Sequence, residues 1–209
     1  MSEIEILITF FFLSVILSVT PGPDILYVFS QSVAKGYKTG VLITLGLCSG
    51  LVAHTLAVAF GLSAIIRQTP FALVLIQYLG AIYLLYIAWH LWRQSVTLGS
   101  DNNQGHLDAW AYYRRGVLMN LSNPKVLLFF LALLPQFVKQ AQGAIALQLI
   151  FLGLIFILAA LLVFISVSLL AQPISKWLGT SSLALVILNK VTVIVFIGLA
   201  INLLLSDLS

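Results

Sequence analysis

Two short polar interruptions inside apolar stretches contain the residues of this sequence that are best placed to do chemistry. The first interrupts the run from Ile4 to Phe29 and reads Thr20-Pro21-Gly22-Pro23-Asp24. The second interrupts the run from Gly116 to Val138 and reads Asn123-Pro124-Lys125. Proline removes a backbone donor and glycine loosens a helix, so each motif predicts a broken helix with a charge beside the break. One break carries an anion and the other a cation.

The composition places these motifs in a membrane. Of the 209 residues, 61% are hydrophobic and 8% are charged, whereas a soluble domain carries about 25% charged residues. The net charge of +4 comes from basic residues scattered through short loops, so it does not indicate nucleic-acid binding. The expected surroundings are membrane lipid. A single cysteine, Cys48, excludes an internal disulfide and a cysteine-based metal site.

Six apolar stretches are long enough to cross a bilayer as helices. They cover residues 5–33, 40–66, 71–92, 116–138, 144–171 and 182–205. The sequence therefore predicts an all-α integral membrane protein with six transmembrane helices, of which the first and fourth are broken. A polar cytoplasmic linker over 93–115 divides the chain into one three-helix repeat over 1–92 and a second over 116–209.

The charges of the loops predict an orientation, because basic residues are enriched on the cytoplasmic side of membrane proteins. One face collects six of them, namely Lys35, Lys38, Arg93, Arg114, Arg115 and Lys176. The other face collects only Arg67 and Lys139. The first face should therefore be cytoplasmic. With six spans, both termini should then lie on the periplasmic side.

Three helices in each half invert the second half relative to the first, as in many secondary transporters. Asp24 lies 11 residues before Lys35, and Lys125 lies 10 residues after Arg115. At ~1.5 Å per helical residue, each charge is ~15 Å from the same face, about half of a ~30 Å hydrocarbon core. Both charges should therefore reach a common depth near the midplane. An isolated charge there is costly, so we expect Asp24 and Lys125 to pair.

Two interpretations of this pair are open. Asp24 and Lys125 could form a bridge that only locks the broken helices together. Alternatively, the free N–H groups that begin each second half-helix suit a carboxylate, while Asp24 suits an ammonium, and together they describe a site for an amino acid. The second interpretation predicts a substrate-binding set that comprises both breaks: Pro21, Gly22, Pro23, Asp24, Asn123, Pro124 and Lys125.

Three further polar residues inside the predicted spans are candidates for the same site. His54 is ionisable within a span, and it is either functional or a neutral hydrogen-bonding residue. Ser18 shares a helix face with Ser14, and it either bonds back to its own helix or lines a cavity beside Asp24. Asn120 belongs to the dense polar cluster of the fourth span.

These motifs resemble the LysE family of amino-acid exporters, in particular its homoserine/threonine (RhtB-type) branch. The matching stretches include Thr20-Pro-Gly-Pro-Asp24, Gly46-x-x-x-Gly50, Gly80-Ala-Ile-Tyr-Leu-Leu-Tyr86, Asn123-Pro-Lys125 and Leu134-Pro-Gln-Phe137. The resemblance implies a six-helix permease of the bacterial inner membrane that exports amino acids or related small zwitterionic metabolites. It also implies that the proton-motive force drives export, and that the protein uses no cofactor other than the coupled protons. The sequence departs from the family in the last helix, at Val193, Ala200 and Asn202.

Two other classes of function compete with transport. An intramembrane enzyme would need a second carboxylate or an activated serine, and Asp24 has no carboxylate partner within a predicted span. A structural or sensory membrane subunit is the other alternative. We expect a transporter rather than an enzyme, with a small amino acid as its binding partner. The oligomeric state, including a homodimer, is left open by the sequence.

Overall fold

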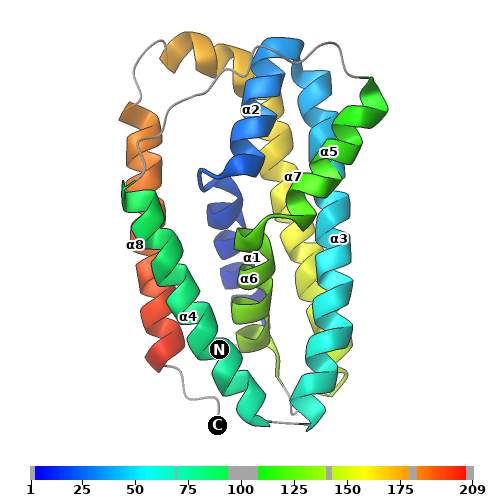
Figure 1. Ribbon diagram of the computed structural model, residues 1–209, viewed down its shortest axis with the longest axis vertical. Coiled ribbons are helices and arrows are strands. Elements are labelled where there is room, and N and C mark those ends of the chain that lie inside the picture. Colours follow the sequence, from blue (N-terminus) through cyan, green and yellow to red (C-terminus); the bar gives the residue numbers. More distant parts are fainter. Residues whose placement is uncertain (1–2, 69, 94–107, 140–142, 179–182, 206–209) are drawn as a thin grey trace.

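All regular elements that the structure describes are helical. The structure is a computed structural model that describes residues 3–68, 70–93, 108–139, 143–178 and 183–205. The first half of the chain forms α1 (Glu3–Val19), α2 (Pro23–Lys35), α3 (Tyr37–Gln68) and α4 (Pro70–Arg93). The second half forms α5 (Ala109–Leu121), α6 (Pro124–Leu133), the short 3-10 helix η1 (Leu134–Phe137), α7 (Ile145–Leu178) and α8 (Leu183–Leu205). The helices form one elongated bundle (Figure 1).

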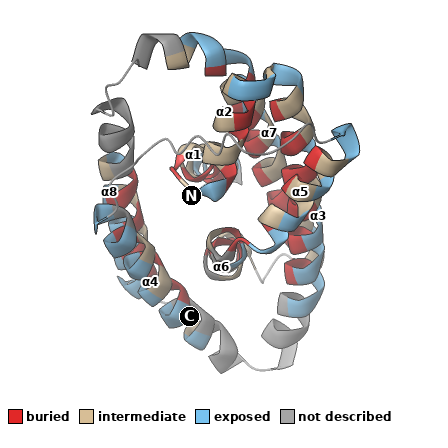
Figure 2. Ribbon diagram, turned by 45° about the horizontal axis from the view of Figure 1, so that its top comes forward, coloured by how far each residue is buried: buried red, intermediate tan, exposed pale blue. Residues whose placement is uncertain are grey.

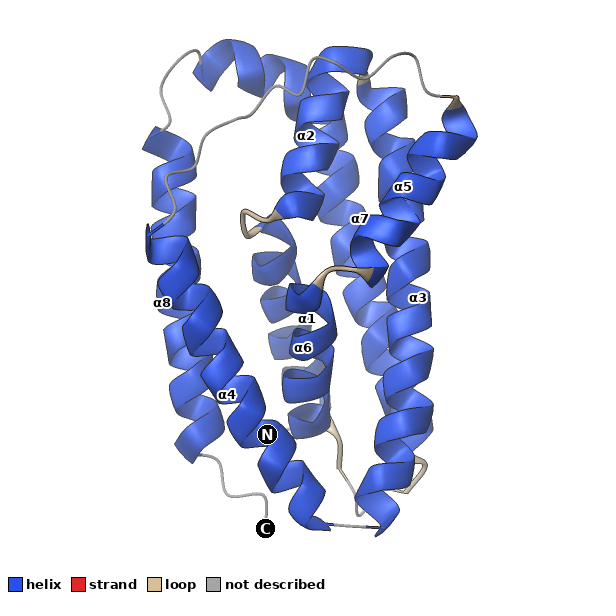
Figure 3. Cartoon of the chain, in the orientation of Figure 1, coloured by secondary structure: helices blue, strands red, loops and turns tan. Residues whose placement is uncertain are grey.

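Both predicted breaks are present, and both lie near the middle of the long axis of the bundle (Figure 3). The chain bends by 60° between α1 and α2, and by 55° between α5 and the helix that follows it. Pro23 and Pro124 begin α2 and α6, where the missing backbone N–H costs no helical hydrogen bond. Asn123 caps α6, because its side-chain oxygen accepts from the backbone N–H of Lys125 at 3.0 Å. Gly22 gives α2 no side-chain cap.

Length and composition identify some of the predicted spans but not all. The stretches Tyr37–Gly61 of α3 and Ile145–Ser175 of α7 are each long and apolar enough to cross a membrane. Each bent pair would count as one further span, which gives up to four among the described residues. The apolar stretches Tyr78–His90 of α4 and Lys190–Leu205 of α8 are shorter. The all-helical fold is therefore confirmed, and the count of six spans stays a prediction.

The predicted linker over 93–115 lies largely outside the described residues. Its C-terminal part is helical, because α5 begins at Ala109. Asp108 sets this start, since its carboxylate accepts from the backbone N–H of Ala111 at 2.8 Å and caps the helix. The fourth apolar stretch thus belongs to a bent pair of helices that starts seven residues before residue 116.

The core forms where α3 packs against α5 and α7, and where α1 and α2 pack against α7. Small residues allow the closest of these approaches. A side chain at Gly46 would meet the backbone carbonyl of Tyr113, and one at Gly116 would meet that of Ile43. The pattern Gly46-x-x-x-Gly50 is therefore a packing face of α3 against α5. Helix α4 packs chiefly on α8 and also on α6.

Buried and exposed residues lie on different sides of the helices (Figure 2). Buried residues line the sides that face other helices, and exposed residues lie outside. Many exposed side chains are large and apolar, including Phe12, Phe60, Leu158 and Ile194. Such a surface suits contact with lipid hydrocarbon. In α8, the atypical residues Val193 and Ala200 are buried.

Candidate functional site

Lys125 reaches from the second break to the first. It lies in the first turn of α6, and its Nζ donates to the carbonyl oxygens of Leu17 at 3.1 Å and Thr20 at 3.2 Å. These carbonyls lie at the C-terminal end of α1, where backbone acceptors lack helical partners and the helix dipole favours a cation. The two bonds use two of the three donors of the ammonium group. Lys125 therefore ties the two broken helices together.

Asp24, in the first break, accepts a hydrogen bond from a side chain of the second break. It lies in the first turn of α2 and is only 7% exposed. The side-chain N–H of Asn123 donates to Asp24 Oδ2 at 2.8 Å. Asp24 Oδ1 has no hydrogen-bond partner among the described residues. A carboxylate oxygen that is buried and without a donor requires an explanation, because leaving it so costs free energy.

The structure differs here from the direct pairing of Asp24 and Lys125 that the sequence predicts. The two charged groups line the same cavity but share no hydrogen bond. The ammonium group instead compensates the negative end of α1, and an uncharged amide takes its place at the carboxylate. The arrangement therefore holds the helices without neutralising Asp24 through a direct contact.

The cavity between the breaks is small and mostly apolar. Its volume is about 20 Å³, which is room for about one water molecule. Polar side chains in its wall come from Ser18, Thr20, Asp24, Asn120 and Lys125. The rest of the wall is Leu17, Ile25, Leu51, Val126, Phe156, Ala160 and Phe164. A solute of amino-acid size can enter only if the helices move apart.

Asn120 supplies a second buried acceptor to this cavity. It is 1% exposed, and its Oδ1 also has no hydrogen-bond partner among the described residues. Glycines make room for both long side chains of the site. A Cβ at Gly50 would lie 2.7 Å from Asn120 Oδ1, and a Cβ at Gly22 would lie 3.3 Å from Lys125 Nζ.

His54 and Ser18 have structural roles that the sequence left open. His54 Nε2 lies 3.2 Å from the backbone carbonyl of Asn120, and because that oxygen only accepts, Nε2 is the donor. Its ring packs near Phe130, and it is not among the residues that line the cavity. Ser18 Oγ donates to the carbonyl of Ser14 at 2.8 Å. Ser18 also lines the cavity, so its two interpretations are compatible.

The ten predicted site residues are thus close together, in different capacities. Ser18, Asp24, Asn120 and Lys125 line the cavity, and Asn123 binds Asp24. His54 holds the backbone of Asn120, and Gly22 lies beside Lys125. Pro21 is buried within the first break, while Pro23 and Pro124 begin the helices that follow the breaks.

Among the described residues, the site offers two oxygen acceptors without a hydrogen-bond partner, beside an ammonium group that has one donor left. The two acceptors suit a ligand with several donors, such as an ammonium group. The remaining donor of Lys125 suits a carboxylate. Both breaks lie within the part of the chain that matches a known protein family. A family model for LysE-type translocators matches residues 15–207, which include both breaks.

The chain belongs to the LysE family of translocators. Curated relatives agree with this assignment. A homoserine/homoserine lactone efflux protein of Salmonella typhimurium is 31% identical over 170 residues, which cover 79% of this chain and 80% of the relative. An uncharacterised membrane protein of Bacillus subtilis is 31% identical over 193 residues, covering 88% and 91% of the two chains. One from Vibrio cholerae is 30% identical over 140 residues, covering 67% and 68%.

No solved structure matches the chain significantly. Membership of the LysE family nevertheless decides between the classes of function that the sequence left in competition. LysE-family translocators and the efflux proteins among the relatives are transporters. This LysE-family chain is therefore a membrane transporter and not an enzyme.

Sequence reasoning missed two kinds of residue in this LysE-type site. The first is the apolar wall of Leu51, Phe156, Ala160 and Phe164, whose residue types do not differ from those of any membrane helix. The second is Thr192 of α8, which is buried. Its hydroxyl donates a hydrogen bond to the hydroxyl of Thr20 at 3.3 Å. A hydroxyl within the otherwise apolar stretch 191–201 was the available signal.

Proposed function

We propose that this LysE-family protein carries out secondary-active efflux of amino acids or related small zwitterionic metabolites, and that its substrate binds between the two breaks. One observation supports the site above all others. Asp24 Oδ1 and Asn120 Oδ1 are buried acceptors that have no hydrogen-bond partner in the described part of the chain, and both residues line one cavity together with Lys125. The ammonium of the substrate would donate to the two oxygens. Its carboxylate would accept from the remaining donor of Lys125.

The inverted repeat gives this site a route to both sides of the membrane. We propose six spans, in which α1 with α2 and α5 with α6 are the two broken ones. The similar bends of 60° and 55°, and the position of both breaks near the middle of the bundle, support this arrangement (Figure 3). Movement of one repeat against the other would open the cavity, now too small for substrate, to alternate sides.

We further propose that the proton-motive force drives export through Asp24. The substrate ammonium and a proton would compete for the same carboxylate. When substrate binds from the cytoplasm, Asp24 gives up its proton to that side. When substrate leaves on the far side, Asp24 takes up a proton there and returns protonated. Each cycle then exchanges one substrate for one proton, and no buried carboxylate crosses the membrane unpaired.

The orientation proposed for the bacterial inner membrane rests on the basic residues. The end of α2 and the beginnings of α3 and α5 lie at one end of the bundle, and α4 runs toward that end (Figure 1). These segments carry Lys35, Lys38, Arg93, Arg114 and Arg115.

A reporter fused after residue 37 should therefore be active in the cytoplasm, and one fused after Ser209 in the periplasm. A cytoplasmic signal from the second fusion would overturn the orientation.

Counterflow in proteoliposomes tests the function itself. Vesicles loaded with unlabelled L-homoserine or L-threonine should take up the labelled amino acid transiently, because a carrier exchanges solute across its single site. A Lys190→Met protein is the matched control, since the Nζ of Lys190 packs over the ring of Trp92 and Lys190 does not line the cavity at the breaks. Counterflow should persist in that variant. Equal uptake by protein-free vesicles would refute carriage of these amino acids.

A further inference from the structure

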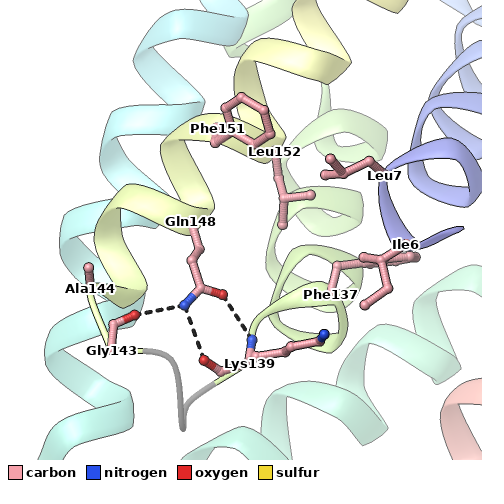
Figure 4. Close-up of a pocket in the computed structure, with 9 residues that line it drawn as sticks. All are labelled: Ile6, Leu7, Phe137, Lys139, Gly143, Ala144, Gln148, Phe151 and Leu152. Carbon is pink, nitrogen blue, oxygen red and sulfur yellow. Dashed lines mark hydrogen bonds between the residues drawn. The ribbon is translucent and has the colours of Figure 1, made fainter. Parts of the chain in front are cut away.

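A second, larger cavity lies at the other end of α1 from the break (Figure 4). Its volume is about 280 Å³, close to the lower end of the ~300–1,000 Å³ typical of small-molecule sites. The start of α1, the segment after η1 and the start of α7 form its wall. Apolar side chains dominate the lining, including Ile6, Leu7, Phe137, Phe151 and Leu152. Among the residues that line it, Lys139 alone carries a charge.

The polar side of this outer cavity is built around Gln148. Its Oε1 accepts from the backbone N–H of Lys139 at 2.9 Å, and its Nε2 donates to the carbonyls of Lys139 at 3.1 Å and Gly143 at 2.7 Å (Figure 4). The amide of Gln148 therefore has a structural role and fixes the backbone that carries Lys139. The side chain of Lys139 extends from that backbone toward Phe137 and Ile6 (Figure 4). Lys139, a half-buried residue, thus lies beside an apolar wall.

The outer cavity and the cavity at the breaks share two helices. Leu7 of α1 and Leu152 of α7 line the outer one, whereas Leu17 and Phe156 of the same helices line the inner one. One helical turn of α7 separates Leu152 from Phe156. Between the two cavities on α1 lies Phe10, which is 0% exposed and meets the ring of Phe137 at 5.0 Å. The packing of Phe10 against Phe137 therefore separates the two cavities along α1.

We propose that the outer cavity is a second binding site for the transported amino acid, which the solute occupies after it leaves the breaks. The proposal rests on the amino-acid transport function proposed above. Lys139 binds the solute carboxylate, and the walls formed by Leu7 and Leu152 take its short side chain. The volume of about 280 Å³ accommodates a small amino acid, whereas the inner cavity of about 20 Å³ does not. A cation that faces an apolar wall binds a ligand with a carboxylate and an apolar side chain in preference to an amine that lacks the carboxylate.

Protection of a single cysteine tests this site directly. Cys48 is buried and is replaced by alanine, and Ile6→Cys then places one thiol in the wall of the outer cavity. Purified protein in nanodiscs exposes both faces, so the result does not depend on orientation. At ten times its dissociation constant, L-threonine should slow modification of that thiol by N-ethylmaleimide about tenfold. Its decarboxylated analogue, 1-aminopropan-2-ol, should give no protection at equal concentration.

Two variants identify which cavity gives the protection. Lys139→Gln should remove it, whereas Lys125→Met should leave it in place. Absence of protection in the Ile6→Cys protein would overturn the inference, as would protection that Lys125→Met removes and Lys139→Gln does not. Counterflow by an otherwise unchanged protein that shows no protection would refute the outer site alone. Absent counterflow with protection intact would refute the transport proposal and leave the outer site standing.

Discussion

Replacement of Lys125 by methionine is expected to lower the efflux rate by about 10-fold to 100-fold while the protein still reaches the membrane. In the proposed mechanism, the variant loses the donor that binds the substrate carboxylate. A hydrogen bond to a charged group contributes about 1.5–3 kcal/mol, and each 1.4 kcal/mol is about a factor of ten. Methionine keeps the length and apolar stem of lysine beside Gly22. The change therefore removes charge with little change of volume.

The measurement is the initial rate of efflux of labelled amino acid from loaded proteoliposomes, normalised to the amount of folded protein. Lys125 also satisfies two carbonyls at the end of α1, so the melting temperature of the variant must be measured alongside. Lys190→Met serves again as the control, because it removes a lysine that is not at the breaks. If the Lys125→Met protein exports at the rate of Lys190→Met, the role of Lys125 is only to tie α6 to α1.

Much of the fold follows from local features of the sequence. Apolar stretches identified the helices, because in hydrocarbon a backbone must satisfy its own hydrogen bonds. The breaks followed from the prolines at positions 21, 23 and 124, since a proline in a helix interior removes a backbone donor and clashes with the preceding turn. The start of α5 at Ala109 was not predicted. It depends on a single cap by Asp108 and falls within the stretch 93–115 that the sequence predicts as a polar linker.

The site was predicted less completely, because its key contacts use the backbone. Positions and types of charged residues predicted that Asp24 and Lys125 reach one cavity, and both do line it. The partners of Lys125 are carbonyls of Leu17 and Thr20, and every residue has a carbonyl, so no residue type points to them. The positions of Phe156 and Phe164 in the wall depend on how α7 packs on α1 and α2. Such packing is a property of the whole bundle.

Replacement of Asp24 by asparagine tests whether the carboxylate acts in transport or only in structure. Asparagine keeps the shape and can still accept from the amide of Asn123, but it cannot carry a proton or attract an ammonium. We expect Asp24→Asn to lose uphill efflux. The single variant also leaves the charge of Lys125 without a counter-charge in the cavity that the two residues share, which lowers stability. Its loss of activity alone therefore does not separate the two roles.

The double variant Asp24→Asn/Lys125→Met separates them, because it leaves no unbalanced charge between the breaks. If Asp24 only balances Lys125, the double variant should melt and export at least as well as Lys125→Met, which already lacks the two bonds to α1. If Asp24 carries the proton and binds the substrate ammonium, the double variant should match the melting temperature of Lys125→Met, while its export against an imposed gradient falls below the residual rate of that variant. Both quantities are measured on the same reconstituted protein, with Lys190→Met as the reference. Export by the double variant against a gradient at the reference rate would refute the functional role of Asp24. The structure favours its loss, since Asp24 Oδ1 is one of two acceptors in the cavity that have no donor among the described residues.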